Sequence, residues 1–149
     1  MPRTAPVGWH SVTPRIFVGD TRRMVTFLKR TFGASGQHQA ARPSEIRIGD
    51  SIVMVSGDAL RGAMPACLYV YVDDVDSTYR RALKAGATSL EAPEVMPYGD
   101  RRCMVEDEWG NLWQIATLGA PAPRPVAKDV KRSPVRTKRV SAKGRPRAR

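Results

Sequence analysis

Two stretches of this 149-residue chain repeat the same order of features about fifty residues apart, and this near-repeat constrains the fold most. Val18-Gly-Asp20 and Val72-Asp-Asp74 each close an alternating apolar run with an aspartate, 54 residues apart. Phe32-Gly-Ala34 and Ala85-Gly-Ala87 each close a helical pattern with a glycine, 53 residues apart. Such a repeat indicates two copies of one strand–helix–strands unit. Each helix covers one sheet face, so the two bare faces can meet or curve around a shared cleft.

The first repeat contains clear start and stop signals. Alternation over residues 11–18 predicts a half-buried strand, and Pro14 favours an edge position or a bulge near its start. Asp20 is a suitable N-cap for the helix that follows, and Gly33 ends the helix where a left-handed φ is wanted. The apolar stripe of this helix is Met24, Phe27, Leu28 and Phe32. Gly49-Asp50 separates two apolar runs, which predicts a tight hairpin.

The second repeat follows the same pattern. Residues 67–72 alternate, with Leu68, Val70 and Val72 on one face and Cys67, Tyr69 and Tyr71 on the other. Asp74 is suited to cap a second helix and Gly86 to close it. Further strands are expected at residues 88–90, 96–98, 101–105 and 112–116.

A turn motif lies near the end of the second repeat, between Val105 and Thr117. Asp107 and Asn111 suit the ends of a turn, and Gly110 can take a positive φ without steric cost. Gln114 then stands at the centre of an apolar run. A polar amide there indicates either a sheet face that looks into a cleft or an amide satisfied by a neighbouring strand or water.

The net charge of +11 is concentrated at one end of the chain. Residues 121–149 contain eleven Lys/Arg and one Asp, a net charge of +10; this leaves fourteen Lys/Arg and thirteen Asp/Glu, or +1, for residues 1–120. The basic segment has five prolines and no aromatic residue, so we expect it to be disordered. Its charge predicts loose, salt-dependent attraction to polyanions.

One short motif in this basic segment has a more specific interpretation. Lys143-Gly-Arg-Pro-Arg147 resembles the core of an AT-hook, in which an extended Gly-Arg-Pro lies along the minor groove of DNA. Lys143, Arg145 and Arg147 are therefore candidate nucleic-acid contacts. Nonspecific attraction and a merely solubilising role are the alternatives.

The composition also limits where the protein works. The chain has no run of 18 apolar residues, so we expect no membrane span, and residues 1–11 lack the apolar core of a signal peptide. Cys67 and Cys103 form neither a disulfide framework nor a Cys-x-x-Cys pair. A reducing, cytoplasmic location is the simplest expectation.

Several segments match a known family in their order and spacing. They are Trp9-His-Ser-Val-Thr-Pro14, Phe32-Gly-Ala34, Ile46-Arg-Ile-Gly-Asp50, Tyr69 to Asp76, Ala85-Gly-Ala87, Tyr98-Gly-Asp-Arg101 and Asp107-Glu-Trp-Gly-Asn-Leu-Trp113. Together, over residues 9–118, they resemble the glyoxalase / bleomycin-resistance / extradiol-dioxygenase superfamily, also called vicinal oxygen chelate. The PhnB-like, glyoxalase-like branch is the most similar.

The resemblance implies an α+β fold of paired βαβββ modules, which form an eight-stranded incomplete barrel around a cleft, and a homodimer. We expect a lead-in over residues 1–10, a glyoxalase-like domain over 11–118 with modules 11–57 and 67–118, and the basic tail over 119–149. The two modules can pair within one chain or between two chains, because the linker between them is compatible with either arrangement.

Metal-dependent members of this family hold their ion with four side chains: a His or Gln, a Glu, a His and a Glu. The resemblance places these positions on Thr13, Met54, Cys67 and Gln114. Divalent Zn, Ni, Fe or Mn sites favour imidazole and carboxylate, and none of these four residues is the expected ligand. We therefore expect no functional metal and no cofactor.

Without a metal, the cleft is expected to work through its other side chains. The candidate lining is Thr13, Arg15, Phe17, Met54, Cys67, Tyr69, Tyr71 and Gln114. Arg15 offers fixed donors for a carboxylate or phosphate, and a salt bridge to Glu106 or another acid is an equal alternative. The aromatic residues offer apolar walls with polar tips.

The sequence assigns no catalytic residue, because it has no Ser/His/Asp set, no paired catalytic carboxylates and no phosphate-binding glycine loop. Cys67 has no histidine near it in sequence, and the role of a small buried apolar residue fits it better than that of a nucleophile. The leading hypothesis is a metal-free protein that binds a small molecule in the cleft. The alternatives are a glyoxalase-type lyase or isomerase with an atypical site, and a DNA-associated dimer that acts through its basic tail.

Overall fold

The structure is a computed structural model that describes residues 5–119. The predicted contacts at Lys143, Arg145 and Arg147 lie outside these residues. Two helices and seven strands form in the described part of the chain, which confirms the α+β class. They are β1 (Arg15–Val18), α1 (Thr21–Phe32), β2 (Ser44–Ile48), β3 (Ser51–Gly57), β4 (Cys67–Tyr71), α2 (Val75–Lys84), β5 (Thr88–Val95), β6 (Arg101–Glu106) and β7 (Leu112–Thr117).

The strands form two separate sheets with the same pattern of connections. The three-stranded sheet has the order β1-β3-β2, and the four-stranded sheet has the order β4-β7-β6-β5. In each sheet the first strand pairs in parallel with the last one, and the other pairs are antiparallel. At the place in the first sheet that corresponds to β5, the described residues make only an isolated bridge between Ser35 and Arg47. The expected eight-stranded barrel is therefore not seen within residues 5–119.

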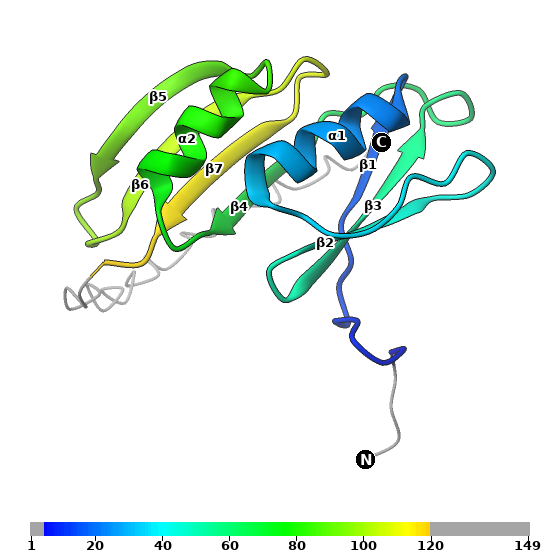
Figure 1. Cartoon of the computed structure of the whole chain (residues 1–149), viewed down its shortest axis with the longest axis horizontal. Coiled ribbons are helices and arrows are strands. Elements are labelled where there is room, and N and C mark those ends of the chain that lie inside the picture. Colours follow the sequence, from blue (N-terminus) through cyan, green and yellow to red (C-terminus); the bar gives the residue numbers. More distant parts are fainter. Residues whose placement is uncertain (1–4, 120–149) are drawn as a thin grey trace, which may run out of the picture.

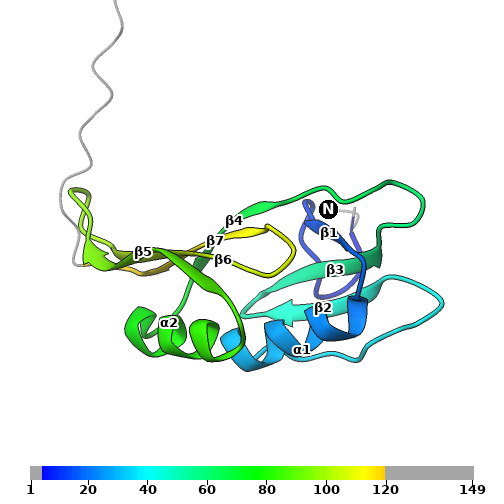
Figure 2. The same cartoon turned by 90° about the horizontal axis from the view of Figure 1, so that it is seen from above.

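Both helices lie on the same side of the molecule, and the sheets lie on the other side (Figure 1 and Figure 2). Helix α1 packs against α2 as well as against its own sheet. The core fills the space between the helices and the sheet faces turned toward them, and includes Ile16, Leu28, Val105, Trp113 and Ile115, all fully buried. We call the two sheet faces turned away from the helices the outer faces. Within the described residues, neither helix is long and apolar enough to cross a membrane.

The N-cap signals of both repeats are confirmed, and so is the closing glycine of the first helix, whereas the C-cap of α2 is Ala85 rather than Gly86. The side chain of Asp20 accepts a hydrogen bond from the Arg23 N–H at 2.9 Å, and that of Asp74 accepts one from the Ser77 N–H at 3.0 Å. Gly33 ends α1 with a φ of 64°, a conformation that glycine adopts without steric cost. Local sequence therefore sets where both helices begin.

The turn between β6 and β7 is organised by one buried carboxylate, as the sequence motif indicates. Asp107 is 4% exposed and accepts hydrogen bonds from the backbone of Trp109 and Asn111 and from the indole Nε1 of Trp113 at 2.9 Å. The side-chain oxygen of Asn111 in turn accepts a bond from the Ala66 N–H at 2.9 Å, directly before β4. The turn thus fixes both the buried tryptophan and the entry into β4.

Three predicted strands differ from the observed ones. The strand expected at residues 88–90 continues to Val95 as β5. The first strand begins at Arg15 rather than at residue 11, and Val12 is 81% exposed. Pro14 cannot donate to a neighbouring strand, although its carbonyl oxygen still accepts from the Met54 N–H at 2.9 Å. Residues 96–98 are not a strand but part of the turn between β5 and β6, which closes through the Met96 N–H and the Asp100 carbonyl oxygen at 2.7 Å.

Candidate functional site

A groove of about 340 Å³ lies where the two sheets meet. The first module contributes the segment before β1 and the tip of the β2–β3 hairpin, and the second module contributes β4. Its twelve lining residues are Val12, Pro14, Ile48, Gly49, Asp50, Ser51, Val53, Leu68, Tyr69, Val70, Tyr71 and Trp113. Pockets for small molecules typically have about 300–1,000 Å³ and mostly apolar walls with a few polar groups. The groove fits this description at the small end.

Three tyrosines gather on the outer face beside the groove. The rings of Tyr69 and Tyr71 have centroids 5.2 Å apart, tilted by 50°. The Tyr71 hydroxyl donates to Asp100 Oδ2 at 2.8 Å, and the Tyr69 hydroxyl donates to the same oxygen at 3.3 Å. The hydroxyls of Tyr69 and Tyr98 are also 3.3 Å apart. Since Asp100 is only 5% exposed, the tyrosines hold a nearly buried carboxylate between the sheet and the β5–β6 turn.

The second oxygen of this carboxylate connects the site to the end of β7. Asp100 Oδ1 accepts a hydrogen bond from the Gly119 N–H at 3.3 Å. A Cβ atom at Gly119 would lie 1.8 Å from the carbonyl oxygen of Gly99, so only glycine allows this close approach of the two backbones. Gly119, which follows β7, is therefore held against the turn that carries Tyr98 and Asp100.

The surroundings of Tyr69 keep its hydroxyl protonated. Burial raises the pKa of Tyr69 well above its usual value, and the hydrogen bond with Tyr98 adds to the effect. The negative charge of Asp100 acts in the same direction. The Tyr69 side chain therefore acts as a neutral hydroxyl and an aromatic face, and not as a base.

The corresponding strand of the first module carries a different pair of side chains. Arg15 stands opposite Met54 in the β1–β3 register, as Tyr69 stands opposite Gln114 in the β4–β7 register. The Arg15 Nε donates to Ser56 Oγ at 2.9 Å, and its guanidinium lies 5.2 Å from the centre of the Phe17 ring. Arg15 is thus bound within its own sheet, and its described contacts do not include Glu106.

The structure brings only part of the predicted lining to the groove. Tyr69 and Tyr71 line it, and Pro14, the neighbour of Thr13, does too. Gln114 is half-buried beside Tyr69 on the next strand. The twelve lining residues do not include Thr13, Arg15, Phe17, Met54, Cys67 or Gln114. Cys67 is exposed, contrary to the expected buried apolar role, because β4 is an edge strand whose odd-numbered residues point to the outer face.

Sequence reasoning missed Tyr98 and Asp100 as site residues. Both lie in the motif Tyr98-Gly-Asp-Arg101, which served only to support the family resemblance. The signal that was available is an aromatic and an acidic residue flanking a glycine, and such a turn holds its side chains close to the sheet edge. Their connection to Tyr69 and Tyr71 depends on contacts between residues about thirty positions apart, which no local pattern reveals.

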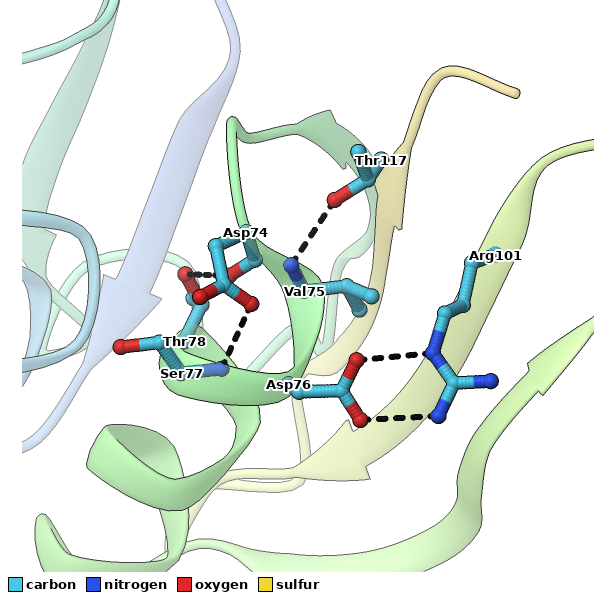
Figure 3. A network of polar contacts seen from close by, with 7 residues as sticks. All are labelled: Asp74, Val75, Asp76, Ser77, Thr78, Arg101 and Thr117. Carbon is cyan, nitrogen blue, oxygen red and sulfur yellow. Dashed lines mark hydrogen bonds and ion pairs between the residues drawn. The ribbon is translucent and has the colours of Figure 1, made fainter. Parts of the chain in front are cut away.

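Arg101, the residue after Asp100, holds β6 in place from the helix side (Figure 3). Arg101 donates from Nε and Nη2 to the two oxygens of Asp76 at 2.7 and 2.8 Å, a bidentate pair between β6 and the first turn of α2. These hydrogen bonds lower the pKa of Asp76 and raise that of Arg101. The Val75 N–H also donates to the Thr117 hydroxyl at 2.8 Å, so α2 is tied to β7 as well.

The family's usual metal is not a good fit for the residues of this chain. At the four corresponding positions, Thr13, Met54, Cys67 and Gln114 offer a hydroxyl, a thioether, a thiol and an amide. Cys67 stands opposite Leu112 in the β4–β7 register, two positions before the Tyr69–Gln114 pair. Across the described residues, no three His, Cys, Asp or Glu side chains come together in a group suited to a metal ion. We therefore derive no chemistry through a metal.

Comparisons with known proteins agree on the fold and the family. The family model described as Glyoxalase/Bleomycin resistance protein/Dioxygenase superfamily matches residues 9–115. An uncharacterized protein of Mycobacterium bovis is 29% identical over 129 residues, covering 74% of this chain and 83% of that protein. Among solved structures, TioX from Micromonospora sp. ML1 is similar at 26% identity with a TM-score of 0.64, covering 72% of this chain and 98% of TioX.

A second solved structure shows the same fold at lower identity. It is a glyoxalase/bleomycin resistance protein/dioxygenase family enzyme from Burkholderia phytofirmans PsJN, with 20% identity and a TM-score of 0.62, covering 71% of this chain and 96% of that one. The PhnB-like branch stays a prediction from the motifs. With the family model matching most of the chain, this protein belongs to the glyoxalase/bleomycin resistance protein/dioxygenase superfamily.

Proposed function

We propose that this protein binds a small molecule, without a divalent metal, in the groove between its two modules. The observation that carries the proposal is the position of Tyr69 and Tyr71, which line a groove of about 340 Å³ while their hydroxyls are fixed by the buried Asp100. Aromatic faces held in place by second contacts lose little conformational entropy when a ligand binds. A preorganised wall of this kind favours binding.

The chemistry of the described residues supports binding over catalysis. The groove offers aromatic rings, backbone atoms, hydroxyls and one carboxylate. Cys67 is exposed, and the contacts of the two histidines are to hydroxyls: His10 to Ser51 at 3.4 Å and His38 to Thr21 at 2.9 Å. A nucleophile needs a base within hydrogen-bond reach, and the described residues provide no such pair around Cys67.

The second part of the proposal is a homodimer in which a second copy covers the outer faces. Large apolar side chains are exposed on this side of the molecule, including Tyr71 at 56% and Tyr69 at 40%. Exposed apolar surface of this kind favours an interface. In such a dimer the sheets of two chains complete the barrel that the family resemblance implies. Sedimentation equilibrium should give twice the chain mass of 16.5 kDa, and a mass of 16.5 kDa at micromolar concentration would remove this part.

The binding proposal is tested with small aromatic compounds and NMR. Phenol, added to the ¹⁵N-labelled full chain, should shift the amide signals of Tyr69, Tyr71 and the hairpin residues 48–51. Tyr71→Ala should abolish these shifts, while Leu83→Ala, a matched loss of an exposed apolar side chain on α2, should not. Shifts spread evenly over the helices, or unchanged binding by Tyr71→Ala, would reject the groove as the site.

The metal part of the proposal has its own test. Protein purified without added chelator should contain no stoichiometric Zn, Ni, Mn or Fe by elemental analysis. Weak hydroxyl, thioether and amide donors at Thr13, Met54 and Gln114 do not compete with water and buffer for these ions. One equivalent of any of the four metals would contradict the proposal.

A further inference from the structure

The segment before β1 forms one wall of the groove but is weakly packed. We call residues 8–14 the N-terminal strap, and two of them, Val12 and Pro14, line the groove. None of the strap residues is buried, and the Val12 side chain is 81% exposed. A segment with few buried apolar contacts opens at a low cost in free energy. The strap therefore depends on polar contacts to stay in its place beside the groove.

These polar contacts are few and come from side chains of the β2–β3 hairpin. Among the described residues, two hydrogen bonds connect residues 8–13 with elements later in the chain. The Gly8 carbonyl oxygen accepts from Arg47 Nη2 at 2.9 Å. The Nδ1 atom of His10 lies 3.4 Å from the Ser51 hydroxyl, which is long for a hydrogen bond. Arg47 is therefore the main attachment of the strap to the hairpin.

Arg47 also holds the turn of the hairpin. Its Nη1 donates to the Asp50 carbonyl oxygen at 3.1 Å, and Asp50 lines the groove. One guanidinium thus bridges two backbone oxygens, one on the strap and one on the hairpin tip, and its planar donors hold them in a fixed geometry. Both bonds are exposed, so water competes for the same groups and their net contribution to stability is small. The strap is therefore fastened, but by a contact that can open.

The backbone at Gly8 fits a close approach to this guanidinium. Gly8 has a φ of 79°, a conformation that glycine adopts without steric cost. A Cβ atom at this position would lie 3.1 Å from Arg47 Nη2, closer than an ordinary van der Waals contact. The contact between the strap and Arg47 can therefore be disturbed from either partner, by removing the guanidinium or by adding a methyl group at Gly8.

We propose that Arg47 is a positioning residue of the groove, which fastens the N-terminal strap where Val12 and Pro14 complete the wall. This inference rests on the proposed binding function. When the bond between Arg47 and Gly8 opens, residues 8–13 can move away, while Pro14 stays held on β3 through the Met54 N–H. A ligand then binds only if the strap is ordered again. Ordering a loose segment costs conformational entropy, so loss of the Arg47 contact weakens binding.

The attachment of the strap is tested first, without a ligand, by ¹⁵N relaxation of the full chain. Arg47→Met keeps a long side chain and removes its donors, whereas Arg42→Met removes the same charge from the exposed loop before β2. Order parameters of residues 8–13 should be about 0.85 in the natural chain and in Arg42→Met, and below about 0.6 in Arg47→Met. Equal values in all three proteins would overturn the inference.

Phenol binding then shows whether this attachment serves the groove. Arg47→Met should weaken phenol binding about threefold, and its unfolding midpoint should change by less than about 2 °C, because the strap lies outside the core. Gly8→Ala disturbs the same bond and leaves the contact between Arg47 and Asp50 in place, so it should weaken binding similarly. A loss in Arg47→Met but not in Gly8→Ala would assign the effect to the hairpin turn and overturn the inference.

Failure of this inference and failure of the proposed function give different results. If phenol binds the natural chain, Arg47→Met and Gly8→Ala with equal affinity, the inference fails and the proposed function stands. If phenol shifts no groove signal in the natural chain, the proposed function fails, and the positioning role of Arg47 fails with it.

Discussion

The two faces of the four-stranded sheet are made by the same strands but are stabilised in different ways. The face turned toward α2 buries Cys103, Val105, Trp113 and Ile115 completely. The outer face leaves Tyr69 and Tyr71 half-exposed and fixes them through a hydrogen-bond cluster around Asp100. The helix-facing side therefore depends on apolar packing, and the outer side depends on polar contacts that hold two partly exposed aromatic rings in place.

Two adjacent arginines of β6 show the same difference at the level of single side chains. Arg101 forms a bidentate pair with Asp76 on α2, in which two donors meet two acceptors. Arg102 points to the other face and bonds Glu91 through Nη2, and its Nε is buried with no hydrogen-bond partner among the described residues. Both donors of Arg101 that face Asp76 are therefore used, whereas Arg102 on the outer side keeps one buried donor without a partner among the described residues.

The largest difference in stability between the faces is expected when two neighbouring residues of β7 are replaced by alanine. Trp113→Ala should lower the free energy of unfolding by about 3–5 kcal/mol, because it empties a fully buried site. Gln114→Ala should change it by less than about 0.5 kcal/mol, because Gln114 points to the outer face. Urea unfolding measures both. Equal losses would show that the outer face is as tightly packed as the inner one.

The two cysteines lie on different faces of the sheet and should therefore differ in reactivity. Burial raises the pKa of Cys103 to about 11, whereas Cys67 is exposed on β4. At pH 8 a thiol-reactive disulfide should therefore modify Cys67 at least about 100-fold faster than Cys103. The raised pKa of Cys103 also makes stability depend on pH. Its contribution to the free energy of unfolding is fully present below the usual thiol pKa and is lost as the pH rises through about 11. Comparable rates at the two thiols in the folded protein would contradict this.

Two tyrosine hydroxyls give a smaller, matched comparison. Tyr71→Phe removes a hydrogen bond of 2.8 Å to the buried Asp100 and should cost about 1.5 kcal/mol. Tyr79→Phe removes a bond of 2.7 Å to the exposed Ser89 beside α2 and should cost about 0.5 kcal/mol. Thermal unfolding of the two variants measures the difference. A larger loss of stability in Tyr79→Phe than in Tyr71→Phe would show that the hydrogen bond from Tyr71 to Asp100 does not stabilise the outer face as expected.

The smallest effect is expected at Asp76, whose ion pair with Arg101 is partly exposed. The hydrogen bonds from Arg101 lower the pKa of Asp76 in the folded state. The resulting stability is fully present above the ordinary carboxyl pKa of 3.8 and is lost as pH falls through the lowered value. Asp76→Asn should therefore be slightly less stable than the natural chain at pH 7, with a difference that shrinks below pH 4. A difference independent of pH would rule out the ion pair as its source.

Sequence patterns predicted the helix-facing side much better than the outer side. The caps at Asp20 and Asp74 and the alternation of residues 67–71 depend on neighbours within a few positions, and the structure shows them as expected. The expected strand at residues 96–98 is a turn instead, because Pro97 and Gly99 interrupt the ladder there. The connection of this turn to Tyr69 and Tyr71, and the engagement of Arg15 by Ser56, come from long-range packing that local periodicity does not contain.

Crystallographic screening with small aromatic compounds tests the proposed binding groove most directly, because it shows where a compound is bound. Bound compounds should gather in the groove beside Tyr69 and Tyr71. A second pocket, between the helices and lined by Arg30, Arg81, Lys84 and Ala85, serves as the internal control. Compounds found in that basic pocket while the groove stays empty would contradict the account.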